Sequence, residues 1–126
     1  MPTGPELNDG RFRNFRLSMQ GMATEIGTGT CSSNAVTIND LMGLITTEAL
    51  TTGEGASQAI TLTNSKIAVG DLVFVTVGLG TATTGTPTVG DVTTAAGSCV
   101  IVILNGDAAD DFNGTLKIGF MVVKAL

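Results

Sequence analysis

Ala59-Ile60-Thr61-Leu62-Thr63 is the segment whose pattern shows the fold class most clearly, because apolar and polar side chains alternate along it. Successive side chains of a β-strand point to opposite faces, so Ile60 and Leu62 are predicted to face a core. Threonine suits the opposite, hydrated face, since its branched Cβ favours extended backbone and its hydroxyl stays in water. The segment therefore predicts a half-buried β-strand.

Similar segments lie on both sides of this one and are separated by turn residues. The pairs Asn105-Gly106 and Asn113-Gly114 are examples of turn chemistry that supplies a positive φ. Strands are predicted at 35–39, 44–50, 58–63, 72–77, 86–93, 98–104 and 115–123. Short strands at this spacing are typical of an all-β fold, and we expect an antiparallel β-sandwich, jelly-roll-like or Ig-like, of about seven to eight strands.

The first 30 residues differ from the rest of the chain. They contain all three arginines and two of the three prolines, and they show no clear periodicity. We therefore expect an extended N-terminal arm over residues 1–30 and a β-sandwich domain over residues 31–126. The arginines of the arm are balanced by three acidic residues, so the formal net charge of −5 belongs to the sandwich.

Composition excludes many functions for this chain of 126 residues. It has no His, Trp or Tyr, so a Ser-His or Cys-His nucleophile pair and a His metal ligand cannot be built. We expect no enzyme and no cofactor. The acidic balance disfavours nucleic acid as a partner, and no apolar run is long enough for a membrane span. The first residues do not form a secretory signal, which favours assembly in a cytoplasm.

Two predicted strands are apolar on both faces, which indicates a partner. Only 13% of the residues are charged and the mean hydropathy is +0.38, which is unusual for a small monomer. A strand that is apolar on both faces must be covered on both. The segments 99–104 and 116–123 have this character, and a sister subunit or a loop of the same chain could cover them. The interface candidates are Val100, Val102, Leu104, Met121 and Val123.

The arm carries one interaction motif, Arg11-Phe12-Arg13-Asn14-Phe15-Arg16-Leu17. Arginine forks pair well with carboxylates and phenylalanine supplies anchoring area, so such a segment suits an acidic, partly apolar groove. The partner-binding candidates are Arg11, Phe12, Arg13, Phe15 and Arg16. Docking on a partner and docking on the chain's own domain or oligomer both remain open.

The cysteines and the acidic loop offer weaker signals. Cys31 and Cys99 are far apart in sequence and have no histidine to complete a metal site, so buried structural thiols are expected, with a disulfide as the alternative. Asp107, Asp110 and Asp111 could offer oxygen ligands to calcium, but their spacing matches no EF-hand. A solvated loop between strands is the favoured interpretation.

A series of segments carries a family resemblance. They are Gly43-Leu44-Ile45-Thr46-Thr47-Glu48-Ala49-Leu50-Thr51-Thr52, Ile60-Thr61-Leu62-Thr63-Asn64-Ser65, Gly85-Thr86-Pro87, Ala96-Gly97-Ser98-Cys99-Val100-Ile101-Val102 and Phe112-Asn113-Gly114-Thr115-Leu116-Lys117-Ile118. Together they resemble small virion proteins of tailed bacteriophages. The resemblance covers residues 43–123 and implies a β-sandwich structural protein of the capsid decoration, head-fibre or tail-fibre kind. The arm has no counterpart in it.

The resemblance and the composition together give a functional expectation. We expect a non-enzymatic capsid decoration (cement) protein that binds the major capsid protein on the outside of a phage head. A homo-oligomer is expected, with a trimer favoured, in a virion assembled in the host cytoplasm. The alternatives are a receptor-binding domain of a tail or head fibre, and a tail or connector component.

Overall fold

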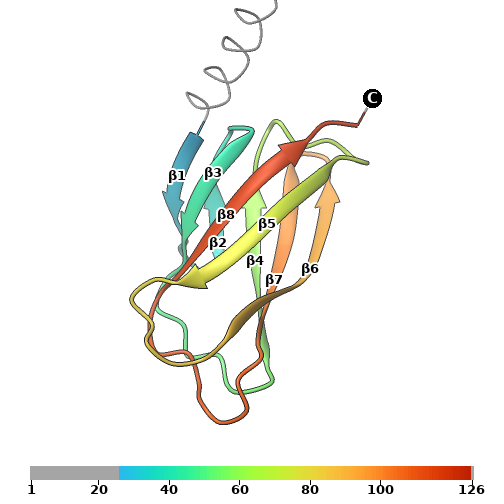
Figure 1. Ribbon diagram of the computed structural model, residues 1–126. Coiled ribbons are helices and arrows are strands. Elements are labelled where there is room, and N and C mark those ends of the chain that lie inside the picture. The colour runs from blue at the N-terminus through green and yellow to red at the C-terminus, as the bar shows by residue number, and fades with distance from the viewer. Residues whose placement is uncertain (1–25, 126) are drawn as a thin grey trace, which may run out of the picture.

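Eight β-strands make up the computed structural model, which describes residues 26–125 (Figure 1). The strands are β1 (Ile26–Thr30), β2 (Ala35–Thr37), β3 (Met42–Thr46), β4 (Ser57–Thr63), β5 (Leu72–Leu79), β6 (Pro87–Ala95), β7 (Ser98–Asn105) and β8 (Leu116–Val123). All seven strands predicted from the sequence are present. The strand β1 was not predicted.

The strands form two sheets of four that pack face to face. Sheet I has the order β1-β3-β8-β5 and sheet II the order β2-β4-β7-β6. The predicted β-sandwich is confirmed, but the prediction of antiparallel sheets is wrong at two pairs, because β1 pairs parallel with β3 and β2 pairs parallel with β4. Each connection from β1 to β4 reverses the chain and changes sheet, so the next strand in the same sheet runs in the same direction.

The core lies between the two sheets. Ile45, Ile118 and Phe120 enter it from sheet I, and Ile60, Leu62 and Ile101 enter it from sheet II, all buried. Thr61 and Thr63 are exposed on the outer face of β4, as the alternation predicts. The residue period of two therefore positions the side chains of both faces, except where the register of β6 shifts between Val89 and Asp91.

Strand β1 extends the sandwich into the range expected for the arm. It forms a five-residue parallel ladder with β3, from Ile26↔Met42 to Thr30↔Thr46. The predicted boundary at residue 30 therefore differs from the structure by at least five residues. The expected arm otherwise falls on residues 1–25, which lie outside the described part of the chain.

Two glycines explain why β1 was not predicted from the sequence. Its two inward positions are Gly27 and Gly29, so it lacks the apolar alternation that marks the other strands. A Cβ added at Gly29 would lie 2.7 Å from Cγ2 of Val36, and one at Gly27 would lie 2.4 Å from Cγ2 of Ile38. Side chains of the opposite sheet thus fill the space beneath β1, and only glycine permits this close approach.

The loops at one end of the sandwich are tied together by a buried amide. Nδ2 of Asn105 donates to the carbonyls of Thr52 and Asp110 at 3.1 and 2.9 Å, and Oδ1 accepts from the amides of Thr86 and Asp107 at 3.1 Å each. The Asn105 side chain is fully buried and all of its capacity is used. Three loops are therefore fixed to the end of β7.

The packing beneath β1 generates a stability prediction. Gly29→Ala is expected to lower the free energy of unfolding by about 1–3 kcal/mol, because the new methyl group overpacks against Val36. Thr28→Val, on the exposed face of the same strand, should change it by no more than about 0.5 kcal/mol. Urea denaturation of the full chain measures both. An unchanged Gly29→Ala midpoint would contradict the packing, and Val36→Ala should partly rescue the variant.

Candidate interaction surface

The outer face of sheet I is apolar and exposed, in contrast to the outer face of sheet II. Its members come from all four strands and alternate with side chains that enter the core. We call this set the apolar face: Ile26, Met42, Leu44, Leu72, Phe74, Met121 and Val123. A contiguous exposed patch of this kind marks an interaction site more often than scattered apolar residues do.

The strand register explains how the patch forms. Ile26 lies opposite Met42, Met42 opposite Met121, and Met121 opposite Phe74, so one apolar side chain from each strand stands in a single row. Leu44 belongs to the next row, and Leu72 stands opposite Val123 on the other side. Leu44, Leu72 and Phe74 are 55%, 66% and 60% exposed. Large apolar side chains are thus left in water across the whole sheet.

A shallow groove of about 380 Å³ crosses the apolar face. Leu44 of β3 and Phe74 of β5 flank it on the two sides of β8, and Gly119 of β8 stands between Leu44 and Thr76. A Cβ added at Gly119 would lie 3.2 Å from Cγ2 of Thr76 and 3.7 Å from Cδ2 of Leu44. The absence of a side chain at Gly119 is therefore what keeps the groove open.

Strands β5 and β8 supply most of the face because both are apolar on two sides. In β5, Val73 and Val75 pack against the core while Leu72 and Phe74 point outward. The run Leu72-Val73-Phe74-Val75 is the sequence signal for this, because it breaks the alternation as strongly as the segments 99–104 and 116–123 do. Sequence reasoning missed Ile26, Met42, Leu44, Leu72 and Phe74.

The five predicted interface residues divide between two opposite faces. Met121 and Val123 of β8 belong to the apolar face. Val100, Val102 and Leu104 lie on the outer face of β7 in sheet II. The structure therefore does not bring the two groups together.

Polar neighbours surround the β7 group. Val100 stands between Thr61 and Thr93, and Leu104 stands between Ser57 and Thr88. Val102 is flanked by Ala59 and Asp91. Only Leu104, at 37%, is a large exposed apolar side chain here. The outer face of sheet II is thus a largely hydrated, threonine-rich surface with a half-covered apolar stripe.

The arm candidates Arg11, Phe12, Arg13, Phe15 and Arg16 lie outside the described residues. The chain that carries them joins the sandwich at Ile26, which stands in the row on the apolar face. The arm and the apolar face are therefore neighbours along the chain.

Both cysteines are free and buried. Burial raises the pKa of Cys99 to about 11, and burial together with the negative charge of Glu48 raises that of Cys31 to about 11. Such thiols hold little thiolate at neutral pH and are unreactive. This agrees with the expectation of structural thiols.

Two carboxylates of the acidic loop accept hydrogen bonds from backbone amides, those of its own loop at Asp107 and that of the loop before β4 at Asp111. Oδ1 of Asp107 accepts the amides of Ala109 and Asp110 at 2.9 Å each, and these bonds hold its pKa below the usual value. Oδ1 of Asp111 accepts the amide of Glu54 at 3.2 Å. Within residues 26–125 no group of three or more His, Cys, Asp or Glu side chains is arranged to hold a metal ion.

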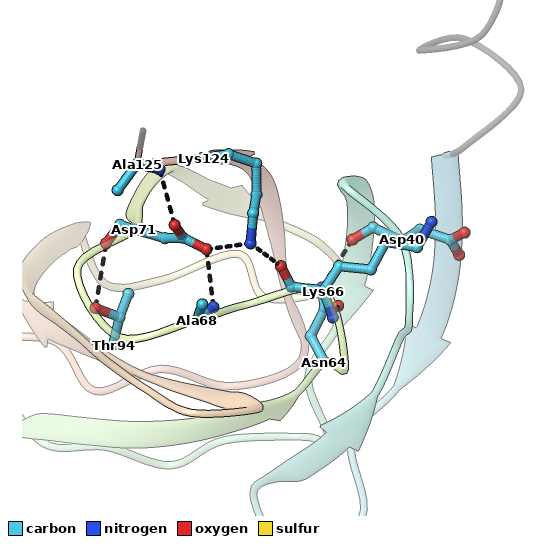
Figure 2. A network of polar contacts seen from close by, with 8 residues as sticks. All are labelled: Asp40, Asn64, Lys66, Ala68, Asp71, Thr94, Lys124 and Ala125. Atoms are coloured by element: carbon cyan, nitrogen blue, oxygen red, sulfur yellow. Dashed lines mark hydrogen bonds and ion pairs between the residues drawn. The ribbon is translucent and has the colours of Figure 1, made fainter.

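A buried carboxylate fixes the end of the apolar face where β5 begins and β8 ends (Figure 2). Asp71 immediately precedes Leu72, and its Oδ2 accepts from Nζ of Lys124 at 2.5 Å and from the amide of Ala68 at 2.8 Å. Its Oδ1 accepts the amide of Ala125 at 2.9 Å. Lys124 immediately follows Val123. The network therefore fixes the backbone next to Leu72 and Val123, two members of the apolar face.

This network holds the pKa of Asp71 at about 2, chiefly through the hydrogen bond from Lys124 and then through the amides of Ala125 and Ala68. Nζ of Lys124 also donates to the carbonyl of Lys66 at 2.6 Å. The hydroxyl of Thr94 donates to the Asp71 carbonyl at 3.2 Å, which ties the start of β5 to sheet II.

Comparison of the chain with protein-family models, with curated proteins and with solved structures finds no match. Within residues 26–125 no helix has the length and apolar character needed to cross a membrane.

The Asp71 network generates an acid-stability prediction. Because the folded-state pKa lies below the unfolded value, the stabilisation is fully present above about pH 4 and is lost as the pH falls toward about 2. Asp71→Asn should therefore be less stable than the natural chain at pH 7, and the difference should shrink toward pH 2. Urea midpoints across this range measure it.

Asp91→Asn provides the control, because it makes the same change of net charge at an exposed side chain. It should alter stability little at pH 7. An Asp71→Asn chain as stable as the natural one at neutral pH would contradict the role of the network.

Proposed function

We propose that the protein is a non-enzymatic structural protein of a tailed-bacteriophage virion, a capsid decoration protein that binds the outer surface of the head as a homo-oligomer. The exposed apolar face, on which Leu44, Leu72 and Phe74 are each more than half exposed, carries the homo-oligomer of this proposal. Such a surface is costly in water and is stabilised when another protein covers it. The resemblance of residues 43–123 to small virion proteins of tailed bacteriophages supports the phage virion.

Sister copies are the first partner in this proposal. A chain with 13% charged residues has few groups to keep its surface soluble as a monomer. A cyclic arrangement in which each copy offers one surface to the next closes after a fixed number of copies, and a trimer is the favoured state. Met121 and Val123 then lie in the interface, as proposed from the sequence, together with Leu44 and Phe74.

The major capsid protein is the second partner. Arg11, Arg13 and Arg16 of the arm are suited to carboxylates on the capsid surface, since guanidinium groups form paired hydrogen bonds with them. A protein that binds the assembled shell and not its free subunits stabilises the shell by mass action. The proposal places the protein on the capsid surface of a virion assembled in the host cytoplasm, without a role for nucleic acid, membrane or cofactor.

The type of sandwich is part of the proposal. Eight strands in two sheets of four favour the jelly-roll-like type over the seven-stranded constant immunoglobulin type. The two parallel pairs distinguish the sheets from the purely antiparallel form of either.

The two outer faces allow a matched test. Phe74→Glu places a charge on the apolar face, and Leu104→Glu makes a comparable apolar-to-Glu change on sheet II. Both side chains are exposed, so both variants should fold. Phe74→Glu is expected to weaken self-association by about 100-fold, in the range of an interface hot spot.

Light scattering over a concentration series measures the association, and co-sedimentation with expanded, empty capsids measures decoration. The natural chain and Leu104→Glu should form oligomers that bind capsids, whereas Phe74→Glu should do neither at the same concentration. Dissociation by Leu104→Glu alone would assign the interface to sheet II. Host-cell binding without capsid binding would favour the receptor-binding alternative, and ring-shaped oligomers a tail or connector component.

A further inference from the structure

We propose that the groove on the apolar face receives the segment 15–19 of a neighbouring copy, so that exchanged N-terminal arms join the copies. This inference rests on the homo-oligomer of the proposed function and names the part of the sister chain that fills the groove. The occupant of the groove is thus an N-terminal arm and not the sheet face of a second copy.

The length and position of the arm support this occupant. Twenty-five residues precede Ile26, and Ile26 itself stands in the row of apolar side chains beside the groove. In a symmetric oligomer the arms therefore start at the surfaces that need to be covered.

The sequence of the arm matches the groove chemically. Phe15, Leu17 and Met19 alternate with Arg16, Ser18 and Gln20. In an extended conformation the three apolar side chains point to one side and the three polar ones to the other. The first side fits an apolar groove, while Arg16 on the second side stays free to contact capsid carboxylates as the proposed function requires.

The shape of the groove also matches. Gly119 and Met121 of β8 line it. Leu44 of β3 and Phe74 of β5 rise on either side of this stretch of β8. A single extended segment can lie between these two side chains, whereas a flat second sheet would rest on their tips and leave the hollow above Gly119 unfilled.

The chain that connects the segment 15–19 to Ile26 suits docking in the groove of a neighbouring copy better than docking in the groove of the same copy. To enter its own groove, the arm would have to reverse direction just before Ile26. The connection 20–25 is Gln-Gly-Met-Ala-Thr-Glu, and Gly21, its one residue that favours a tight reversal, lies two residues from Met19 and five from Ile26. Docking in the same copy would also cover the apolar face without linking any copies. Exchange with the next copy covers the face and closes the ring.

Cysteine cross-linking of the full chain tests the occupant directly. Leu17→Cys places a thiol in the arm, and Thr76→Cys places one beside the groove on the exposed face of β5. The natural Cys31 and Cys99 are buried, so the background should be low. The control is Thr61→Cys, the same substitution at an exposed position on sheet II.

The two single variants are mixed as chains of different mass and oxidised mildly. A disulfide that joins a Leu17→Cys chain to a Thr76→Cys chain, at least ten times more abundant than one to Thr61→Cys, is the expected result. Disulfides between two Thr76→Cys chains alone would overturn the proposal, because they would show two apolar faces packed on each other. A third chain carries both Leu17→Cys and Thr76→Cys. A disulfide within that chain, with none between the two single variants, would also overturn the proposal.

A groove-filling variant gives an independent readout. Gly119→Leu should displace the arm and leave the sandwich folded, because the new side chain lies on the outer face. Trypsin should then cleave after Arg16 at least ten times faster than in the natural oligomer. Equal cleavage rates, with the oligomer intact by light scattering, would overturn the arm proposal but not the proposed function. A monomeric natural chain would instead refute the oligomer of the proposed function.

Discussion

Strand β8 has to place apolar side chains on both of its faces, and much of the structure follows from that constraint. Ile118, Phe120 and Val122 enter the core between the sheets, while Met121 and Val123 point the other way. Because β8 is a central strand of sheet I, its neighbours β3 and β5 add Leu44 and Phe74 to the same outer surface. One strand thus contributes both to the core and to a surface that requires a partner.

The rest of the sandwich holds that surface rigid. Glycines in β1 let Val36 and Ile38 approach closely from the other side, which fixes the edge strand against the core. Asp71, Lys124 and Ala125 hold the other edge, where β5 begins and β8 ends. The row of apolar side chains therefore lies on a preorganised face, which reduces the entropy lost when a partner binds.

The period of two predicted the sandwich well but predicted its outer surfaces incompletely. Ile60 and Leu62 are buried as the alternation requires, and every predicted strand is present. Strand β1 gave no signal because its inward positions are glycine, and the parallel pairs depend on how connections cross between sheets. Leu44 and Phe74 were missed because exposure depends on which strands are neighbours. Strands β7 and β8 are both apolar on two faces, so their sequences alone do not distinguish them. On its outer face β7 has mainly threonine neighbours, whereas β8 has apolar ones.

Hydroxyl-radical footprinting of the natural full chain in solution tests the central claim, that the apolar face is covered in the assembled protein. Leu44 and Phe74 are 55% and 60% exposed in the isolated sandwich, and Leu104 is 37% exposed. If the apolar face is covered, Leu44 and Phe74 should be modified several times more slowly than their exposed fractions imply. Leu104 should be modified at the rate that its exposed fraction implies. Modification of Leu44 and Phe74 at the rates expected from the isolated sandwich would contradict the account.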